Sequence, residues 1–131
     1  MAKLLKIIDL ENGLQLKLYD RSRKLAGDRW LVFLTAIIDI PLDEIAVHAV
    51  DKAEINLDEC KQALGAKIRF EQTRQRHFIE ANQKDQVLQD SVNSLLDSSR
   101  RYFAHPAFAV KILVKAYREH IRKKSFSAAN A

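Results

Sequence analysis

The chain has 131 residues, of which 47% are hydrophobic and 30% charged, proportions typical of a globular protein. This length suits one domain and allows a hydrophobic core that needs no disulfide or metal to hold it together. We therefore exclude disorder over the whole chain. We expect a single domain over residues 1–131, in which residues 125–131 form a frayed tail.

The cysteine and hydropathy patterns bear on the cellular compartment. The chain contains one cysteine, Cys60, so it cannot form an internal disulfide and does not depend on an oxidising environment. No segment has the roughly 20 apolar residues that a membrane-spanning helix needs. The apolar pair Leu4-Leu5 is too short for the core of a signal peptide. These features predict a cytoplasmic protein that has no membrane partner.

The net charge of +5 is unevenly distributed along the chain. Residues 31–60 carry seven acidic groups and one lysine, whereas residues 106–131 carry six basic groups and one acid. Such asymmetry can steer a charged partner or orient two copies of the same chain.

The first forty residues predict β-structure. Leu14, Leu16 and Leu18 alternate with polar residues, which is the period of a strand with one buried face. Asn12-Gly13 precedes them and predicts a tight hairpin turn. A third strand is expected from Arg29 to Ile40. Because both of its alternating sets are apolar, we expect both faces to be covered by helices, a second sheet or another subunit.

The middle of the chain is less regular. Pro41 should end the third strand, and residues 42–56 indicate no firm structure. Asn56 is a good N-cap for a short helix that Gly65 should terminate. Residues 66–80 are compatible with either a strand or a helix, and we favour a strand.

The C-terminal part predicts two helices. Asn82 should cap the first of them, in which apolar residues recur at helical spacing as far as Phe103. His105-Pro106 should break the chain, and the last helix is expected from about Pro106 to Lys124.

These elements together predict an α+β fold. It consists of a three- to four-stranded antiparallel sheet that begins with an N-terminal hairpin meander and is packed by two C-terminal helices.

The sequence predicts no metal site and no cofactor. The histidines are scattered along the chain without the spacing of a zinc site. The glycines Gly13, Gly27 and Gly65 each fall at a turn, so no glycine-rich phosphate loop can form. Asp58 and Glu59 precede Cys60 and oppose formation of a thiolate. These observations favour a non-enzymatic protein, although an active site can also assemble from scattered residues.

Two basic features are candidates for binding nucleic acid or another anion. Around residues 67–76, Arg74 and Arg76 share strand parity with Phe70, as in exposed platforms that stack single-stranded bases, and Arg69 lies beside them. On the last helix, the spacing of the basic residues places them in one stripe that is long enough to follow a phosphate backbone. The stripe comprises Lys111, Lys115, Arg118 and Arg122.

The function that we favour from sequence alone is a protein-interaction or assembly module that acts as a homodimer or with another protein. The two-sided third strand, with Trp30 and Phe33, and a second apolar face on the last helix, with Ile112 and Ala116, suggest the interface. Nucleic-acid binding through the two basic features is the alternative. An enzymatic function is the third and least favoured hypothesis.

Overall fold

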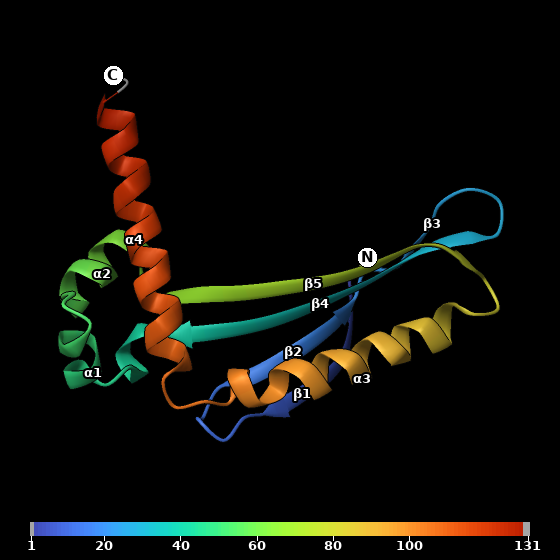
Figure 1. Ribbon diagram of the computed structural model, residues 1–131, viewed down its shortest axis with the longest axis horizontal. Coiled ribbons are helices and arrows are strands. Elements are labelled where there is room, and N and C mark those ends of the chain that lie inside the picture. The colour runs from blue at the N-terminus through green and yellow to red at the C-terminus, as the bar shows by residue number, and fades with distance from the viewer. Residues whose placement is uncertain (1, 130–131) are drawn as a thin grey trace. The chain divides into compact units, whose positions relative to one another are not determined.

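The computed structural model describes residues 2–129, whose helices and strands are labelled in Figure 1. These residues form two compact units. Among these residues, the first unit comprises 2–38 and 71–105, and the second comprises 39–70 and 106–129. Each unit is described separately below. In chain order the elements are β1 (Lys3–Asp9), β2 (Gln15–Asp20), β3 (Arg23–Lys24), β4 (Arg29–Pro41), the 3-10 helix η1 (Leu42–Glu44), α1 (Val47–Lys52), α2 (Leu57–Leu64), β5 (Lys67–Glu80), α3 (Lys84–Phe103) and α4 (Phe108–Ala129).

The first unit is an antiparallel meander with one helix, α3. β1 pairs with β2, β2 pairs with β4, and the short β3 pairs with the beginning of β4. β5 pairs with β4 as well, so residues 66–80 contain a strand, as we favoured, and not a helix. The predicted α+β class is therefore confirmed.

The hairpin at Asn12-Gly13 forms, but its turn differs from the expected one. The β1–β2 pairing ends at Asp9 and Gln15, so the connection is a longer loop than a two-residue turn. Gly13 has a φ of +88°, whereas Asn12 is not among the positive-φ residues of the described chain. The Asn12 amide instead donates to the end of α3, at Phe103 O (2.8 Å) and His105 O (3.1 Å). Within the loop, Gly13 N donates to Leu10 O at 3.0 Å and Leu10 N donates to Leu14 O at 2.8 Å, so the turn combines local hydrogen bonds with a tertiary contact.

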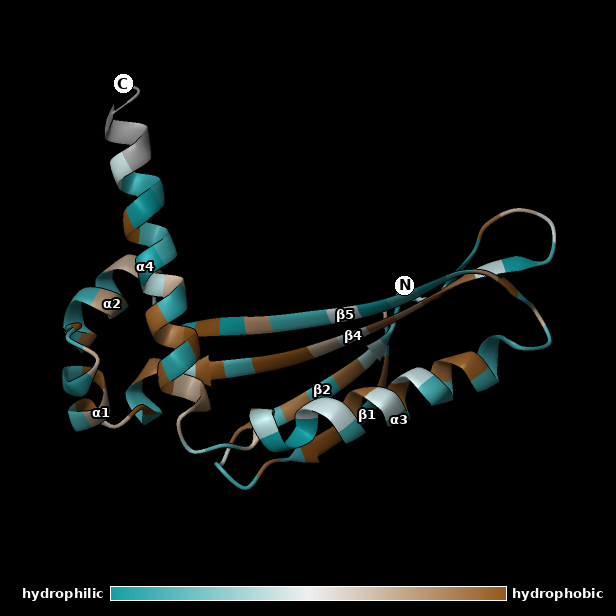
Figure 2. Ribbon diagram, in the orientation of Figure 1, coloured by the Kyte–Doolittle hydropathy of each residue, from teal (hydrophilic) through white to brown (hydrophobic). Residues whose placement is uncertain are grey.

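The core of the first unit lies between β4 and α3. Trp30 on β4 and Arg74 on β5 both contact α3, which identifies the face of the sheet that the helix covers. Because side chains alternate along a strand, the even-numbered residues of β4 lie on this face. Buried apolar residues here include Leu16, Leu18, Val32, Leu34, Ala36, Ile38, Val92, Leu95 and Phe103. Figure 2 shows β4 as a largely hydrophobic strand.

The other face of β4 is also buried, although the first unit has no second helix among its described residues. Leu31 and Ile37 are each 4% exposed, and Thr35 is fully buried. Tyr19 of β2 stands directly opposite Thr35, so side chains of neighbouring strands provide part of the cover. Phe33 is half-buried. This apolar face, which we expected to need a helix, a second sheet or another subunit, is mostly enclosed within the chain.

The second unit contains the remaining helices and the ends of β4 and β5. Asn56 caps α2 by accepting a hydrogen bond from Glu59 N at 3.0 Å, and Gly65 ends the helix at a φ of +89°, both as predicted. Residues 42–56, which indicated no firm structure, form η1 and α1. Phe108 of α4 is buried edge-on against Phe70 of β5, with ring centroids 5.2 Å apart.

Three helix boundaries differ from the prediction. The residue before α3 is Gln83, not Asn82, and it makes no capping hydrogen bond through its side chain. α4 begins at Phe108, after a turn at Pro106 and Ala107. Its backbone continues beyond Lys124 as far as Ala129; residues 130 and 131 of the expected frayed tail lie outside the described residues. No helix in the described chain is long and apolar enough to span a bilayer.

Candidate functional site

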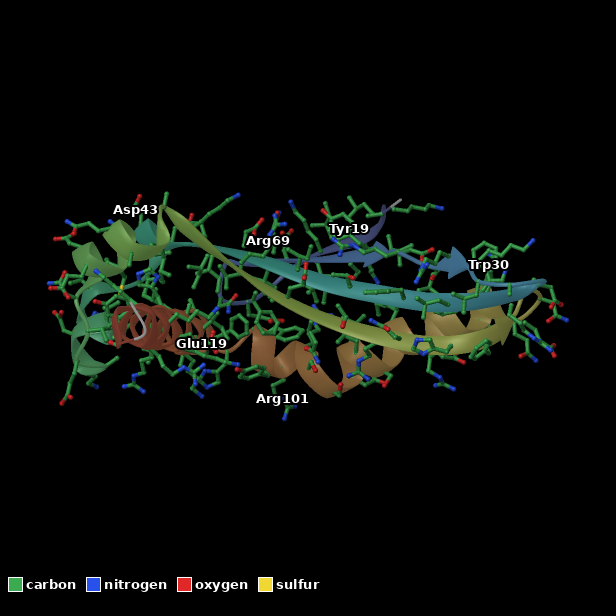
Figure 3. All side chains as sticks on the ribbon, turned by 90° about the horizontal axis from the view of Figure 1, so that it is seen from above. Tyr19, Trp30, Asp43, Arg69, Arg101 and Glu119 are labelled. Atoms are coloured by element: carbon green, nitrogen blue, oxygen red, sulfur yellow. The ribbon has the colours of Figure 1, made fainter. Side chains whose placement is uncertain are left out.

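The basic residues predicted on the last helix form one exposed face of α4. All of its members, Lys111, Lys115, Arg118 and Arg122, are solvent-exposed. They line a shallow groove of about 360 Å³ together with Val114 and Glu119. We call these four residues the cationic face of α4. Figure 3 labels Glu119, the acidic residue of this helix.

The buried side of α4 explains why the cationic face is free. Leu113 is fully buried, and Tyr117, one turn later, donates its hydroxyl to Glu59 Oε2 of α2 at 3.3 Å. These contacts fix the rotation of the helix against α2. Residues on the opposite side, beginning with Lys111 and Lys115, therefore face solvent.

Two acidic groups of the second unit, Asp39 and Asp43, bind other basic residues. Asp43 forms an ion pair with Lys61, and Asp39 binds Arg69 through two hydrogen bonds of 2.8 and 3.2 Å. The Asp43 carboxylate is also the largest cause of the raised pKa of Lys61. In the described part of the chain, no carboxylate forms an ion pair with the cationic face of α4. Glu119 lines the same groove and reduces the net positive charge there, but it forms no ion pair with the four cations.

The three arginines expected around β5 have different environments. Arg69 is held by Asp39, so its charge is already paired. Arg74 points toward α3 and donates to the hydroxyls of Ser94 at 3.2 Å and Ser98 at 3.0 Å. Arg76 is exposed and, with Arg74, lines a cleft between β5 and α3.

The arrangement that we expected for single-strand stacking does not occur on this face. Phe70 packs against Phe108, and α3 covers Arg74, so neither side chain belongs to an open aromatic platform. Each side chain is covered within its own unit, Phe70 by α4 and Arg74 by α3. The sequence of β5 alone does not reveal this cover.

The residues predicted for an oligomer interface are partly covered within the chain. The ammonium of Lys84 lies 4.8 Å from the centre of the Trp30 ring, which Figure 3 labels beside the start of α3. Phe33, Ile112 and Ala116 are each half-buried. None of the four is among the most exposed large apolar side chains of the chain.

Another apolar surface, which the sequence did not predict, lies on the edge strand β1. Leu4 and Ile7 are 46% and 48% exposed, and Leu5 is 36% exposed. β1 pairs only with β2, so its other edge is open in the described structure. The apolar run Leu4–Leu10 is visible in the sequence. Its pattern does not show which of these side chains remain exposed in the fold.

Cys60 does not form part of a reactive site. Its side chain is fully buried. Burial, followed by the charge of Glu59, raises the pKa of the thiol and so disfavours the nucleophilic thiolate. No group of three or more metal-ligating side chains is found among the described residues.

These features define an α+β protein with a solvent-facing cationic helix and a separate arginine-lined cleft. No protein-family model, curated protein or solved structure matches the chain.

Proposed function

We propose that the protein is a non-enzymatic module that binds nucleic acid through the phosphate backbone, using the cationic face of α4. The observation that carries this proposal is that four neighbouring cations face solvent while no carboxylate of the described chain pairs with them. Lys123 and Lys124 extend the positive charge along the helix.

The spacing of the cationic face suits a repeating anion. Lys111 and Arg122 are eleven positions apart, which corresponds to about 16 Å along a helix that rises 1.5 Å per residue. A single DNA strand presents a phosphate about every 3.4 Å along the duplex axis. Several consecutive phosphates therefore lie within reach of one helix face, and contacts of this kind carry no base specificity.

Affinity measured against salt concentration tests the proposal. We expect the protein to bind a labelled duplex in a fluorescence anisotropy titration. If all four cations engage phosphates, log K should fall with log salt with a slope of about −3.6. Replacing Lys115 and Arg118 by alanine should make the slope shallower by about two units and weaken different duplex sequences to a similar extent.

Arg23 and Lys24 provide the matched control. They form the short strand β3, are exposed, and offer the same loss of one arginine and one lysine. Their alanine double variant should leave the slope close to that of the natural sequence. Equal weakening by both double variants, or no binding at low salt, would contradict a dedicated α4 surface.

Self-association is a second candidate, and the exposed edge of β1 favours it. An open strand edge with apolar side chains is a template for pairing with another chain. The partner that we propose for this edge is β1 of a second copy. Three of the large apolar side chains that the fold leaves exposed, those of Leu4, Leu5 and Ile7, lie on this one strand.

Light scattering at micromolar concentration tests the dimer. Ile7→Lys should convert a dimer to a monomer, because a buried lysine without a partner opposes association. Val47→Lys is the control, since Val47 is 59% exposed on α1. A monomeric mass for the natural sequence would exclude this second candidate.

A further inference from the structure

The first unit contains a cleft of about 480 Å³ between β5 and α3, in addition to the surfaces described above. Its walls include Arg74 and Arg76 from the strand and Val87, Asp90, Ser91 and Ser94 from the helix. This volume is within the range of sites that hold small molecules.

Arg74 is fixed in the cleft without a counter-ion. Its two terminal nitrogens donate to Ser94 Oγ and Ser98 Oγ, both on α3, and its Nε is buried with no hydrogen-bond partner. Neutral hydroxyls orient the guanidinium but do not compensate its charge. A partly buried charge without an opposite charge is costly, and a bound anion would offset that cost.

The hydroxyls of α3 add to this preference for an anion. Ser94 Oγ accepts a hydrogen bond from Arg74, so the Ser94 proton is free to point toward another acceptor. Ser91, by contrast, donates its proton to Val87 O at 2.9 Å. Arg74, Arg76 and Ser94 therefore supply donors to one cleft, and the described residues provide no carboxylate that forms an ion pair with either arginine.

We propose that this cleft binds the oxyanion group of a small molecule, a phosphate or a carboxylate. Guanidinium groups can bind either group through two parallel hydrogen bonds. Asp90, whose carboxylate accepts a hydrogen bond from Gln86 at 2.9 Å, lies at the same cleft and limits its affinity for anions. Val87 supplies an apolar wall for the uncharged part of the ligand.

Titration by two-dimensional NMR tests the cleft in the full chain, with inorganic phosphate and acetate as separate probes. The expected result is saturable shifts at the Arg74 side chain and at the backbone amides around Arg76 and Ser94, at about millimolar concentration. The stronger probe identifies the oxyanion source, phosphate or carboxylate. The absence of saturable shifts in the cleft with both probes would overturn the proposal.

Three variants separate a specific site from general positive charge. Arg76→Gln should weaken binding about tenfold or more without unfolding the protein, because this side chain is exposed. Asp90→Asn should strengthen binding about two- to fivefold by removing a like charge. Arg101→Gln removes an exposed charge from α3 outside the cleft and should leave binding unchanged. Equal effects of Arg76→Gln and Arg101→Gln would overturn the proposal.

The cleft and the cationic face of α4 are tested independently. The Lys115→Ala and Arg118→Ala double variant should still bind the small anion in the cleft. Loss of the cleft shifts in that variant would show that the probe responds to overall charge, and this would contradict a site at Arg74. Cleft shifts that arise only with an oligonucleotide would also contradict the small-molecule assignment.

Discussion

Asn12 in the β1–β2 loop donates its side-chain amide to Phe103 O at 2.8 Å and thereby joins the hairpin to the end of α3. The same amide reaches His105 O at 3.1 Å, while Asn12 Oδ1 accepts a hydrogen bond from Leu14 N. The last carbonyls of a helix have no partner within the helix. The Asn12 side chain therefore accepts a hydrogen bond within the loop and also donates one to a carbonyl at the end of α3.

Asn12→Asp should destabilise the protein by about 1–3 kcal/mol, as judged by urea unfolding. The aspartate keeps the acceptor for Leu14 N, but it cannot donate to Phe103 O. It also places negative charge at the negative end of the helix dipole. Asn82→Asp is the control, because Asn82 is exposed and does not cap α3. Equal unfolding midpoints for the two variants would contradict this role of Asn12.

Gly13→Val should lower the free energy of unfolding by about 1–2 kcal/mol. Gly13 has a φ of +88°, and an added Cβ would meet no atom within 4 Å. The cost is therefore backbone strain and not a clash. Gly13→Asn should cost less than Gly13→Val, because asparagine tolerates positive φ. The opposite order in thermal or urea unfolding would show that some other contact decides the loop.

Regular patterns predicted much of the β-sheet. The alternation of Leu14, Leu16 and Leu18 located β2, and the long apolar run between Arg29 and Ile40 located β4. These patterns involve only residues within one strand, so they can be recognised from the local sequence. The two-residue form of the turn at Asn12 was not found, and the hydrogen bond from its side chain to α3, more than ninety positions away, could not be predicted from the local sequence.

The two candidate sites also differ in how far local sequence patterns could predict them. The cationic face of α4 was predicted in full, since helical spacing alone brings Lys111 and Arg122 onto one side. The cleft was not predicted, because it requires Arg74 to meet Ser94 on a separate element. Tertiary packing determines which elements contact one another, and it buries Phe70 against Phe108. The local repeat of apolar residues does not determine these contacts.

Glu54→Gly should raise the free energy of unfolding by about 0.5–1 kcal/mol. Glu54 follows α1 with a φ of +62°, a conformation that costs most residues about 1–2 kcal/mol. Glycine relieves this strain but adds entropy to the unfolded chain, so the net gain is smaller. Lys52→Gly, within α1, should instead destabilise by about 0.5–1 kcal/mol. A loss of stability on Glu54→Gly would show that the glutamate side chain makes a contribution larger than the strain.

Cys60 should make the stability of the protein depend on alkaline pH. Burial, and then the charge of Glu59, raises the pKa of the folded thiol above the ordinary value of 9.0. Below pH 9 both the folded and the unfolded thiols are protonated, so this contribution to stability is fully present. As the pH rises, the unfolded thiol ionises first and the contribution is progressively lost. The loss cannot exceed about 1.4 kcal/mol per pH unit, the limit for one proton.

Urea midpoints measured between pH 8 and 10 test this dependence against Cys60→Ala, which should remove the component due to the thiol. The pH range ends at 10 so that ionisation of Tyr117 contributes little. The pKa of Tyr117 is also raised, by burial and then by the charge of Glu59, from an ordinary value of 10.0. Tyr117 therefore contributes in the same direction, but mainly at higher pH. Glu59→Gln should lower the pKa of both groups and flatten the decline, while Asp58→Asn, at the adjacent exposed position, should change it less. Parallel midpoint curves for the natural sequence and Cys60→Ala up to pH 10 would show that the buried thiol has no part in the alkaline response.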